Sequence, residues 1–403
     1  MNVSIVRKID YWVGIPICFV LDLIYYLSKL NPFKKRATKN PKKFLFIELS
    51  EMGSSILTYP TMKYLENKYP DAELFFMIFK KNRASVDILN TVKLENVLTI
   101  NDSSLFSFLV DTVKNIIRMR KERIDVIFDL ELFSRATAIL TYLSGAQSKV
   151  GFYRHQMEGL YRGNFFTHKV QYSFGQHISK SFLSCAKALK APADILPTMN
   201  QSIRDEEIFS ATYNSSEEKI KNIWYKLQQE NSQINKNNKL IIFNPSGGEI
   251  PIRAWPLEKY IDLAKKLLAD ENVYIITTGS KSDLKFCKNF CNLVANNRCL
   301  NFAGKTSFTE LIDLYNVADI LLTNDGGPAH FASLTPIKVF AFFGPETPVL
   351  YRPLGKNINI LYSNFPCSPC LSAFNHRFTS CKNSKCLQII SVDEVYNKII
   401  EKI

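Results

Sequence analysis

The residues best suited to chemistry gather in short turns, each of which follows a run of residues typical of a buried strand. The most distinctive turn is Thr323–His330 (TNDGGPAH), which opens a helical pattern. Backbone N–H groups and the helix dipole hold phosphate at such strand–helix turns, and Gly326 and Gly327 permit a close backbone approach. Asp325 would order the loop or bind a sugar hydroxyl. An ordinary turn before a helix is the alternative interpretation.

Two further turns strengthen the prediction of a phosphate site. Phe343–Pro348 (FGPETP) follows the next predicted strand, and Asn244–Gly248 (NPSGG) follows an earlier strand and precedes Arg253. A glycine-rich backbone followed by a cation suits a diphosphate, and Arg253 would neutralise the charge of the leaving group. Taken alone, an arginine of this kind is more often a solvated surface residue.

The fourth turn, Thr278–Asp283 (TGSKSD), places Asp283 just past a strand, where an acidic side chain can bind ribose hydroxyls. A role in the N-cap region of the following helix is the alternative for this carboxylate. Near the N-terminus, Ser50–Ser55 (SEMGSS) is a strand–helix turn of the same kind and carries Glu51.

Length and charge narrow the class of protein. A chain of 403 residues predicts two domains, and 46% hydrophobic with 22% charged residues is typical of globular proteins. The net charge of +14 suits an anionic partner. Nucleic acid is not favoured, because the sequence has no recognisable zinc-finger or RNA-binding signature and no basic helical stripe.

An apolar stretch, Tyr11–Leu27, lies near the N-terminus and is interrupted by Gly14, Pro16 and Asp22. It is barely long enough to cross the roughly 30 Å hydrocarbon core, and Asp22 would be costly at mid-depth. Since no small-residue cleavage site follows, we expect a retained membrane anchor that either lies in the interface or spans marginally. A hydrophobic helix buried on the first domain is the alternative.

Basic residues follow this stretch directly and suit an anionic membrane surface. The positive-inside bias keeps the rest of the chain in the cytoplasm in either geometry. The seven basic residues are Lys29, Lys34, Lys35, Arg36, Lys39, Lys42 and Lys43.

Four of the nine cysteines are close together in the sequence near the C-terminus, with the spacing Cys367-x2-Cys370-x10-Cys381-x4-Cys386. That spacing can hold a structural zinc through four thiolates or form two disulfides. In a cytoplasmic protein zinc is favoured over disulfides, and plain thiols are an equally good interpretation.

Strand-like and helical segments alternate along the chain, which predicts parallel, doubly wound sheets in two Rossmann-like domains. Ligands bind such sheets at the carboxyl ends of the strands. The predicted divisions are a hydrophobic helix with a basic linker at 1–40, an N-terminal domain at 41–214, a polar linker helix at 215–238, a C-terminal domain at 239–386 and a helix at 387–403. The predicted strands are 43–49, 73–79, 97–100, 125–129, 240–244, 273–277, 320–323 and 338–342.

The order of these segments resembles glycosyltransferase family 9, the heptosyltransferases of lipopolysaccharide core assembly. The resemblance covers residues 43 to about 360 and rests on KFLFIELSEMGSSILTYPTMKYLENKYPDAEL, NPSGGEIPIRAWPLEKYIDLA, NFAGKTSFTELIDLYNVADILLTNDGGPAHFASL and FFGPETP. It implies a GT-B fold, in which two Rossmann-like domains face an interdomain cleft. The C-terminal domain would bind the nucleotide-sugar donor and the N-terminal domain the acceptor. The resemblance also implies inversion of the anomeric centre without a metal.

Site residues follow from the resemblance position by position. Arg253 matches a diphosphate contact that is usually a lysine, Asp283 matches the ribose contact, and Gly326 replaces the more common threonine. Arg135 falls where the acidic acceptor binds, with a surface ion pair as the alternative. The predicted donor residues are Ser246, Gly247, Arg253, Asp283, Asp325, Gly326, Gly327, His330 and Gly344, and the predicted acceptor residues are Ser54 and Arg135.

One position departs from the family pattern. The family has a catalytic aspartate after the glycine of the first strand–helix turn, and this chain has Ser54 there. Serine cannot act as a general base unaided. Glu51, three residues earlier, is the predicted substitute and would take the acceptor proton as the hydroxyl attacks the anomeric carbon. The alternative is that Glu51 only caps the following helix at its positive end.

The sequence therefore predicts an inverting glycosyltransferase at the cytoplasmic face of a bacterial inner membrane. It would move a sugar, heptose before others, from a nucleotide sugar such as ADP-heptose to a lipid-linked saccharide such as lipopolysaccharide core. The expected partners are the nucleotide sugar, the lipid-linked acceptor and an anionic membrane surface. Because Ser54 replaces the aspartate, a non-catalytic membrane-associated protein that binds nucleotide sugars or acts as a scaffold is the alternative.

Overall fold

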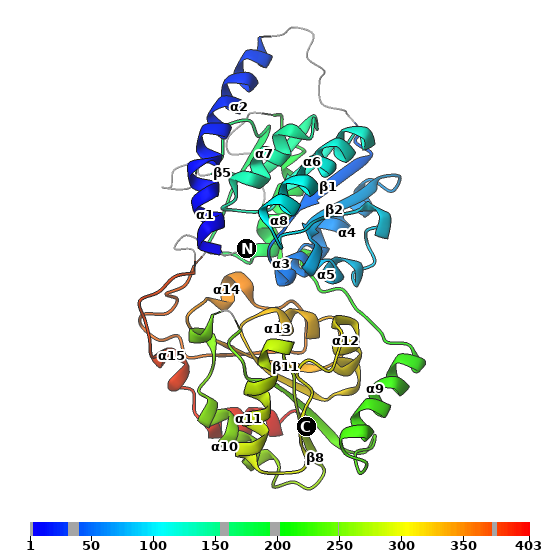
Figure 1. Ribbon diagram of the computed structural model, residues 1–403, viewed down its shortest axis with the longest axis vertical. Helices are drawn as coiled ribbons and strands as arrows, with labels where there is room; N and C mark the ends of the chain where they lie inside the picture. Colours follow the sequence, from blue (N-terminus) through cyan, green and yellow to red (C-terminus); the bar gives the residue numbers. More distant parts are fainter. Residues whose placement is uncertain (1–2, 31–39, 154–160, 194–201, 249, 373–376) are drawn as a thin grey trace. The chain divides into compact units, whose positions relative to one another are not determined.

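The chain divides into two compact units, Met1–Phe209 and Ser210–Ile403, in a computed structural model (Figure 1). The structure describes residues 3–30, 40–153, 161–193, 202–248, 250–372 and 377–403. Four of the predicted basic linker residues, Lys34, Lys35, Arg36 and Lys39, lie outside the described residues. Each unit contains a six-stranded sheet in which every strand pairs in parallel with its neighbours.

Unit 1 is built on a sheet with the strand order β3-β2-β1-β4-β5-β6. Its strands are β1 (Lys43–Ile47), β2 (Glu73–Phe79), β3 (Val97–Ile100), β4 (Val126–Asp129), β5 (Ser148–Tyr153) and β6 (His168–Gln171). Its helices are α1 (Val3–Trp12), α2 (Gly14–Lys29), α3 (Met52–Leu57), α4 (Tyr59–Lys68), α5 (Ala84–Asp87), α6 (Leu105–Glu122), α7 (Arg135–Leu143) and α8 (Ile178–Ala188).

Unit 2 has the strand order β12-β11-β10-β7-β8-β9. Its strands are β7 (Lys239–Asn244), β8 (Val273–Thr277), β9 (Cys299–Asn301), β10 (Ile320–Asn324), β11 (Lys338–Phe343) and β12 (Ile358–Tyr362). Its helices are α9 (Glu217–Glu230), α10 (Leu257–Leu267), α11 (Leu284–Val294), α12 (Phe308–Val317), α13 (Gly327–Ala332), α14 (Pro348–Tyr351), α15 (Lys385–Gln388) and α16 (Val392–Ile400). The predicted linker helix corresponds to α9, which packs on α12.

The two sheets share one topology. Counted from the first strand of each unit, both have the order 3-2-1-4-5-6 of a Rossmann fold. In unit 1, strands β1 to β3 are added toward one edge of the sheet and β4 to β6 toward the other, so the switch point lies between β1 and β4. In unit 2 the switch point lies between β7 and β10 for the same reason. Ligands bind such sheets beyond the carboxyl ends of the strands at this switch point. The predicted α/β class with two doubly wound domains is confirmed.

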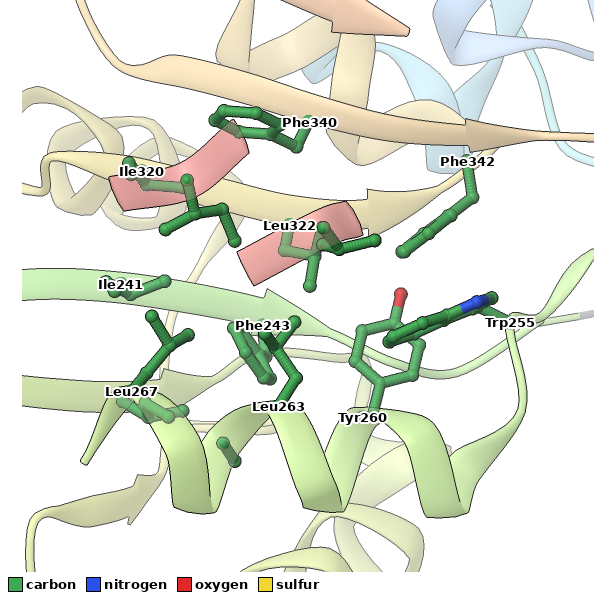
Figure 2. Close-up of a cluster of buried hydrophobic side chains, with 14 of the residues drawn as sticks. Ile241, Phe243, Trp255, Tyr260, Leu263, Leu267, Ile320, Leu322, Phe340 and Phe342 are labelled. Carbon is green, nitrogen blue, oxygen red and sulfur yellow. The ribbon is translucent and has the colours of Figure 1, made fainter. Parts of the chain in front are cut away.

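The core of unit 2 explains how its switch point is held (Figure 2). The strands are apolar on both faces because helices cover both sides of the sheet. Trp255 stacks on Phe342 with ring centroids 4.6 Å apart, and Tyr260 meets Trp255 edge to face at 5.1 Å. These rings pack the start of α10 against β11.

The N-terminal helix, formed by α1 and α2, packs on the rest of unit 1 through one of its sides. Cys18, Leu21 and Tyr25 of α2 are buried against a cluster that includes Ala138 of α7 and Phe165. By length and composition, the helix over Val6–Lys29 could also cross a membrane. One face of this helix is therefore buried on the first domain, as the predicted alternative expected, while the helix as a whole is long and apolar enough to cross a membrane.

Candidate functional site

Asn324 ties the turn after β7 to the end of β10 in unit 2. Its Nδ2 donates to the carbonyl oxygens of Pro245, at 3.1 Å, and Ser246, at 3.2 Å. Its Oδ1 accepts from the backbone N–H of Trp255 at 2.9 Å. Asn324 is buried, so these bonds form away from water and hold the turn over the switch point. Asn324 lies in the TNDGGPAH turn but was not among the predicted donor residues.

Arg253 lies between two carboxylates. Its Nη2 donates to Oε2 of Glu346 at 2.7 Å, and its Nε is 3.4 Å from Oδ2 of Asp325. Arg377 reaches the same Glu346 oxygen at 3.6 Å. The Glu346 side chain is only 1% exposed. Arg253, predicted as a diphosphate contact, thus shares its charge with two acidic side chains.

Glu346 and Arg377 are additions to the predicted site. Glu346 belongs to the FGPETP turn, so a signal for it was present in the sequence, whereas only Gly344 was selected from that turn. Arg377 lies between Cys370 and Cys381 of the cysteine motif, whose spacing gives no signal for an arginine that contacts Glu346. The structure brings both side chains to Arg253 from the segments that follow β11 and β12.

Asp283 joins the turn after β8 to the turn after β7. Its Oδ1 accepts from Ser246 Oγ at 2.7 Å, and its Oδ2 accepts from the backbone N–H of Ser280 at 2.8 Å. Partial burial works to raise its pKa, but the hydrogen bonds from Ser246 and Ser280 outweigh it and lower the pKa. The predicted helix-cap alternative is present as a capping box with Ser280, and the bond to Ser246 links the turn after β8 to the turn after β7.

The short helix α13 carries the remaining residues of the TNDGGPAH turn. Gly327 is its first residue, and a Cβ atom there would lie 2.9 Å from the ring of Phe331. His330 is buried within the helix. Asp325, Gly326, Gly327 and His330 therefore all lie at the carboxyl end of β10, where a Rossmann-like unit binds ligand.

The glycines of the turns after β7, β10 and β11 differ in the room around them. A Cβ atom at Gly247 would lie 2.8 Å from the Cα of Pro251, and one at Gly344 would lie 2.9 Å from the Sγ of Cys386. Neither position accommodates a side chain without a shift of its neighbours. At Gly326 the nearest atom would be 3.8 Å away, and the φ of 167° is extended backbone. A Cβ atom therefore fits at Gly326 without a shift of its neighbours.

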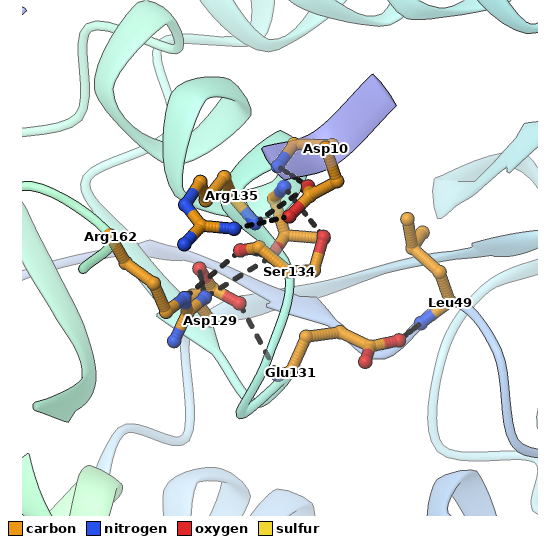
Figure 3. A network of polar contacts seen from close by, with 9 residues as sticks. Asp10, Leu49, Asp129, Glu131, Ser134, Arg135 and Arg162 are labelled. Atoms are coloured by element: carbon orange, nitrogen blue, oxygen red, sulfur yellow. Dashed lines mark hydrogen bonds and ion pairs between the residues drawn. The ribbon is translucent and has the colours of Figure 1, made fainter. Parts of the chain in front are cut away.

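In unit 1, Glu131 spans the switch point between β1 and β4 (Figure 3). Its Oε1 accepts from the backbone N–H groups of Leu49, at 2.9 Å, and Ser50, at 3.0 Å, and from Ser50 Oγ at 3.0 Å. Burial raises the pKa of Glu131, and the nearby Glu51 carboxylate raises it further. Two acidic side chains therefore lie close together at the carboxyl ends of β1 and β4.

Glu51 and Ser54 interact directly within the first strand–helix turn. Ser54 Oγ donates to Glu51 Oε2 at 3.1 Å, and Ser54 is largely buried. Glu51 occupies the N-cap position of α3, yet its side chain makes no capping hydrogen bond among the described residues. The carboxylate of Glu51 thus lies at the positive end of α3 and is held there by Ser54, an arrangement compatible both with the predicted base and with the capping alternative.

Arg135 is occupied by structural contacts. Its side chain is 4% exposed, its Nη1 is 3.1 Å from Oδ2 of Asp10 on α1, and its Nε donates to the carbonyl of Tyr161 at 2.8 Å (Figure 3). Neighbouring Arg162 forms a buried ion pair with Asp129. These contacts favour a structural role for Arg135, and its predicted contact with the acceptor gains no support from them.

The nine cysteines, all of which lie in the described ranges, are free thiols. Cys386 is buried and Cys367 is exposed, and neither disulfide that the spacing allows is formed. Within the described parts of the chain, no three His, Cys, Asp or Glu side chains are grouped so as to hold a metal ion. The zinc site predicted for Cys367, Cys370, Cys381 and Cys386 thus has no support from the arrangement of these thiols.

Known proteins are similar to this chain along most of its length. The chain shares 24% identity with lipopolysaccharide heptosyltransferase 3 of Escherichia coli (strain K12), over 85% of this chain and 93% of that protein. It shares 21% identity with the lipopolysaccharide core heptosyltransferase OpsX of Haemophilus influenzae, over 81% of this chain and 87% of that protein.

A solved structure and a family model agree with these relatives. The structure of E. coli ADP-heptose lipopolysaccharide heptosyltransferase II matches with a TM-score of 0.68 and 18% identity, covering 89% of this chain and 98% of that one. At that identity the likeness concerns the fold, and it supports the GT-B class. The family model described as glycosyltransferase family 9 (heptosyltransferase) matches residues 114–377. This chain belongs to glycosyltransferase family 9 and is a glycosyltransferase.

Proposed function

We propose that the protein transfers a heptosyl group from ADP-heptose to a lipid-linked saccharide of the lipopolysaccharide core type, with inversion of the anomeric centre. The similar proteins are lipopolysaccharide heptosyltransferases, and the similar solved structure is that of an ADP-heptose heptosyltransferase. The reaction would take place at the cytoplasmic face of the inner membrane, where the net charge of +14 suits anionic lipid.

One observation carries the mechanism: the serine at the family's aspartate position donates a hydrogen bond to a carboxylate in the same turn. Glu51 is then the general base, and Ser54 orients it. The acceptor hydroxyl gives its proton to Glu51 while its oxygen attacks C1 of the heptose. The bond between C1 and the diphosphate breaks on the opposite side, which inverts the anomeric carbon.

Unit 2 holds the donor in this proposal. The departing ADP carries the electron pair of the broken bond, and Arg253 with the backbone N–H groups at Gly326, Gly327 and Gly344 stabilises the added charge. Asp283 binds the ribose hydroxyls, which requires it to exchange its bond with Ser246. To meet the diphosphate, Arg253 must likewise release part of its contact with Glu346 and Asp325.

Release of nucleoside diphosphate tests this proposal. Purified protein is incubated with ADP-heptose and a panel of other nucleotide sugars, with membrane lipid extract as acceptor. The same assay is run on Glu51→Gln and on a control outside the predicted site, Glu66→Gln, whose carboxylate pairs with Lys63 on α4. We expect acceptor-dependent release of ADP that falls in Glu51→Gln and not in the control. We also expect NMR of the product to show an inverted anomeric configuration. Donor binding without release from any donor would favour the non-catalytic alternative.

A further inference from the structure

The helix formed by α1 and α2 has two faces of different character. Its inward face packs on unit 1 through Cys18, Leu21 and Tyr25. Its outward face is largely apolar from Tyr11 to Leu27: Trp12 is 73% exposed, Phe19 58% and Leu27 67%. Such a continuous apolar stripe is costly in water and marks a surface that another apolar phase covers.

Both acidic residues of this helix are turned into the protein. Asp10 Oδ1 accepts from the backbone N–H groups of Arg135, at 2.9 Å, and Ala136, at 3.0 Å, at the start of α7, while its Oδ2 pairs with the Arg135 guanidinium. Asp22 is 5% exposed and accepts from the hydroxyl of Tyr161. Asp22 also accepts from the backbone N–H of Asn164.

These contacts oppose a membrane span. A helix that crossed a bilayer would leave unit 1, break the bonds of Asp10 and Asp22, and place both carboxylates in or near hydrocarbon. It would also leave the buried guanidinium of Arg135 without its acidic partner, which is unfavourable in a low-dielectric interior. The asymmetric burial instead matches a helix that lies parallel to the surface and inserts only its apolar side.

The charge of the outward face indicates which kind of membrane surface it would contact. Asp10 and Asp22 are the only acidic residues between positions 3 and 29, and both face inward. The outward positions are therefore apolar or cationic, and they include the exposed residues Arg7 and Lys8. Further basic residues follow the helix in the sequence, from Lys29 to Lys43. Cations beside an apolar stripe complement anionic lipid head groups.

We propose that α1 and α2 form a monotopic docking helix, which stays folded on unit 1 and inserts its outward face into the interface of an anionic bilayer without crossing it. This inference deepens the proposed location at a membrane and rests on it. Its test does not use turnover, so failure of the docking helix and failure of the proposed transfer reaction are distinguished.

Vesicle sedimentation tests the docking face. The full chain is mixed with phosphatidylcholine vesicles with and without phosphatidylglycerol, and the bound fraction is measured. We expect binding to the anionic vesicles, and a loss of about tenfold in affinity or more for Phe19→Glu/Leu23→Glu, because two inserted apolar side chains become charged. Leu293→Glu changes an exposed leucine on α11 and serves as the matched control. Since all three side chains are exposed, unchanged circular dichroism confirms folding.

Quenching by brominated lipids distinguishes docking from spanning. Tryptophan is placed at position 12, 20 or 27 in turn, with Trp12→Phe combined with Val20→Trp or Leu27→Trp, while Trp224 and Trp255 remain as a constant background. A docked helix places all three positions at the same shallow depth, so bromine near the head group quenches each best. Strongest quenching of position 20 by bromine deep in the acyl chain would show a span and overturn the proposal. Self-association without vesicle binding would overturn it as well.

Discussion

The guanidinium of Arg253 is oriented by Glu346, whose Oε2 accepts from Nη2 at 2.7 Å while the carboxylate is almost fully buried. Arg253 begins no secondary element of its own and ends a single 3₁₀ turn. Its direction is therefore set by the turn that follows β11, not by its own backbone. This links the stability of unit 2 to the geometry of the proposed diphosphate contact.

We expect Glu346→Ala to destabilise unit 2 by roughly 1.5–3 kcal/mol, the range for losing a hydrogen bond to a charged group in a buried site. The remaining Arg253 would keep only the longer contact with Asp325. Urea unfolding followed by tryptophan fluorescence measures the change, since Trp255 is buried in unit 2.

The control for this measurement is Glu394→Ala, because Glu394 forms an exposed i,i+4 pair with Lys398 at 2.9 Å. Pairs of that kind contribute about 0.3–0.5 kcal/mol. Equal losses of unfolding free energy in the two variants would show that burial does not strengthen the contribution of the Arg253–Glu346 pair.

Gly247 and Gly326, in the turns after β7 and β10, should differ in their tolerance of a side chain. Gly247→Ala places a Cβ atom 2.8 Å from the backbone of Pro251 and must shift the turn after β7, so we expect a higher KM for the donor. Gly326→Ala meets nothing closer than 3.8 Å, and we expect a KM within about twofold of the parent, since an unstrained surface turn loses little. Steady-state kinetics with varied donor separates them, and a large effect at Gly326 would contradict the geometric argument.

The fold could be predicted from the sequence wherever strands are long and apolar. Strands β2, β3 and β8 begin and end at the predicted residues. Except for β3, the strands at the sheet edges were missed, namely β6, β9 and β12, and so was β5 beside β6. HKVQ in β6 and CLN in β9 are too short and too polar for a pattern to be visible, and they form strands because a neighbouring strand pairs with them.

The site could be predicted only in part, for a related reason. Glycine-rich turns are local, so the turns after β7, β8, β10 and β11 were recognised from the sequence. Asn324 lies in the recognised TNDGGPAH turn, but its bonds to Pro245, Ser246 and Trp255 join residues far apart along the chain, and the sequence does not reveal them. The contact of Arg377 with Glu346 is hidden in the same way. Arg135 shows the same limit: its contact with Asp10 could not be predicted, because Asp10 lies 125 residues earlier, in a helix interpreted as a separate anchor.

Restoring the family's aspartate should rescue a variant that lacks Glu51. We expect Glu51→Gln to lower kcat by about 10²–10⁴-fold, the usual contribution of a general base. In Glu51→Gln/Ser54→Asp, a carboxylate returns to the same turn at the position that the family uses, and part of that loss should be recovered. Ser54→Ala alone removes the bond to Glu51 Oε2 and should cause a smaller loss.

The rescue is measured as acceptor-dependent ADP release at saturating donor. Glu51→Gln/Ser54→Ala is the matched control, because it changes the same two positions without supplying a carboxylate. Parental activity in Glu51→Gln would remove Glu51 from the mechanism, whatever the double variants do.

The carboxylate of Glu131 should shift the pH dependence of the reaction. Glu51 raises the pKa of Glu131, and such coupling is reciprocal, so an ionised Glu131 disfavours the ionised form of Glu51. A general base works only when ionised, which makes kcat/KM rise with pH on the acid limb. In Glu131→Gln the repulsion is lost, and the acid limb should therefore move to lower pH.

The same variant separates this electrostatic effect from damage to the turn. The glutamine amide oxygen can still accept from Leu49 and Ser50, so the turn after β1 should keep its bonds. Glu131→Ala loses both the charge and the bonds, and we expect a lower kcat as well as the shifted limb. The measurement is kcat/KM against pH for the parent, Glu131→Gln and Glu131→Ala. An acid limb that stays in place in Glu131→Gln, or moves to higher pH, would mean that Glu51 is not the group whose ionisation the profile reports.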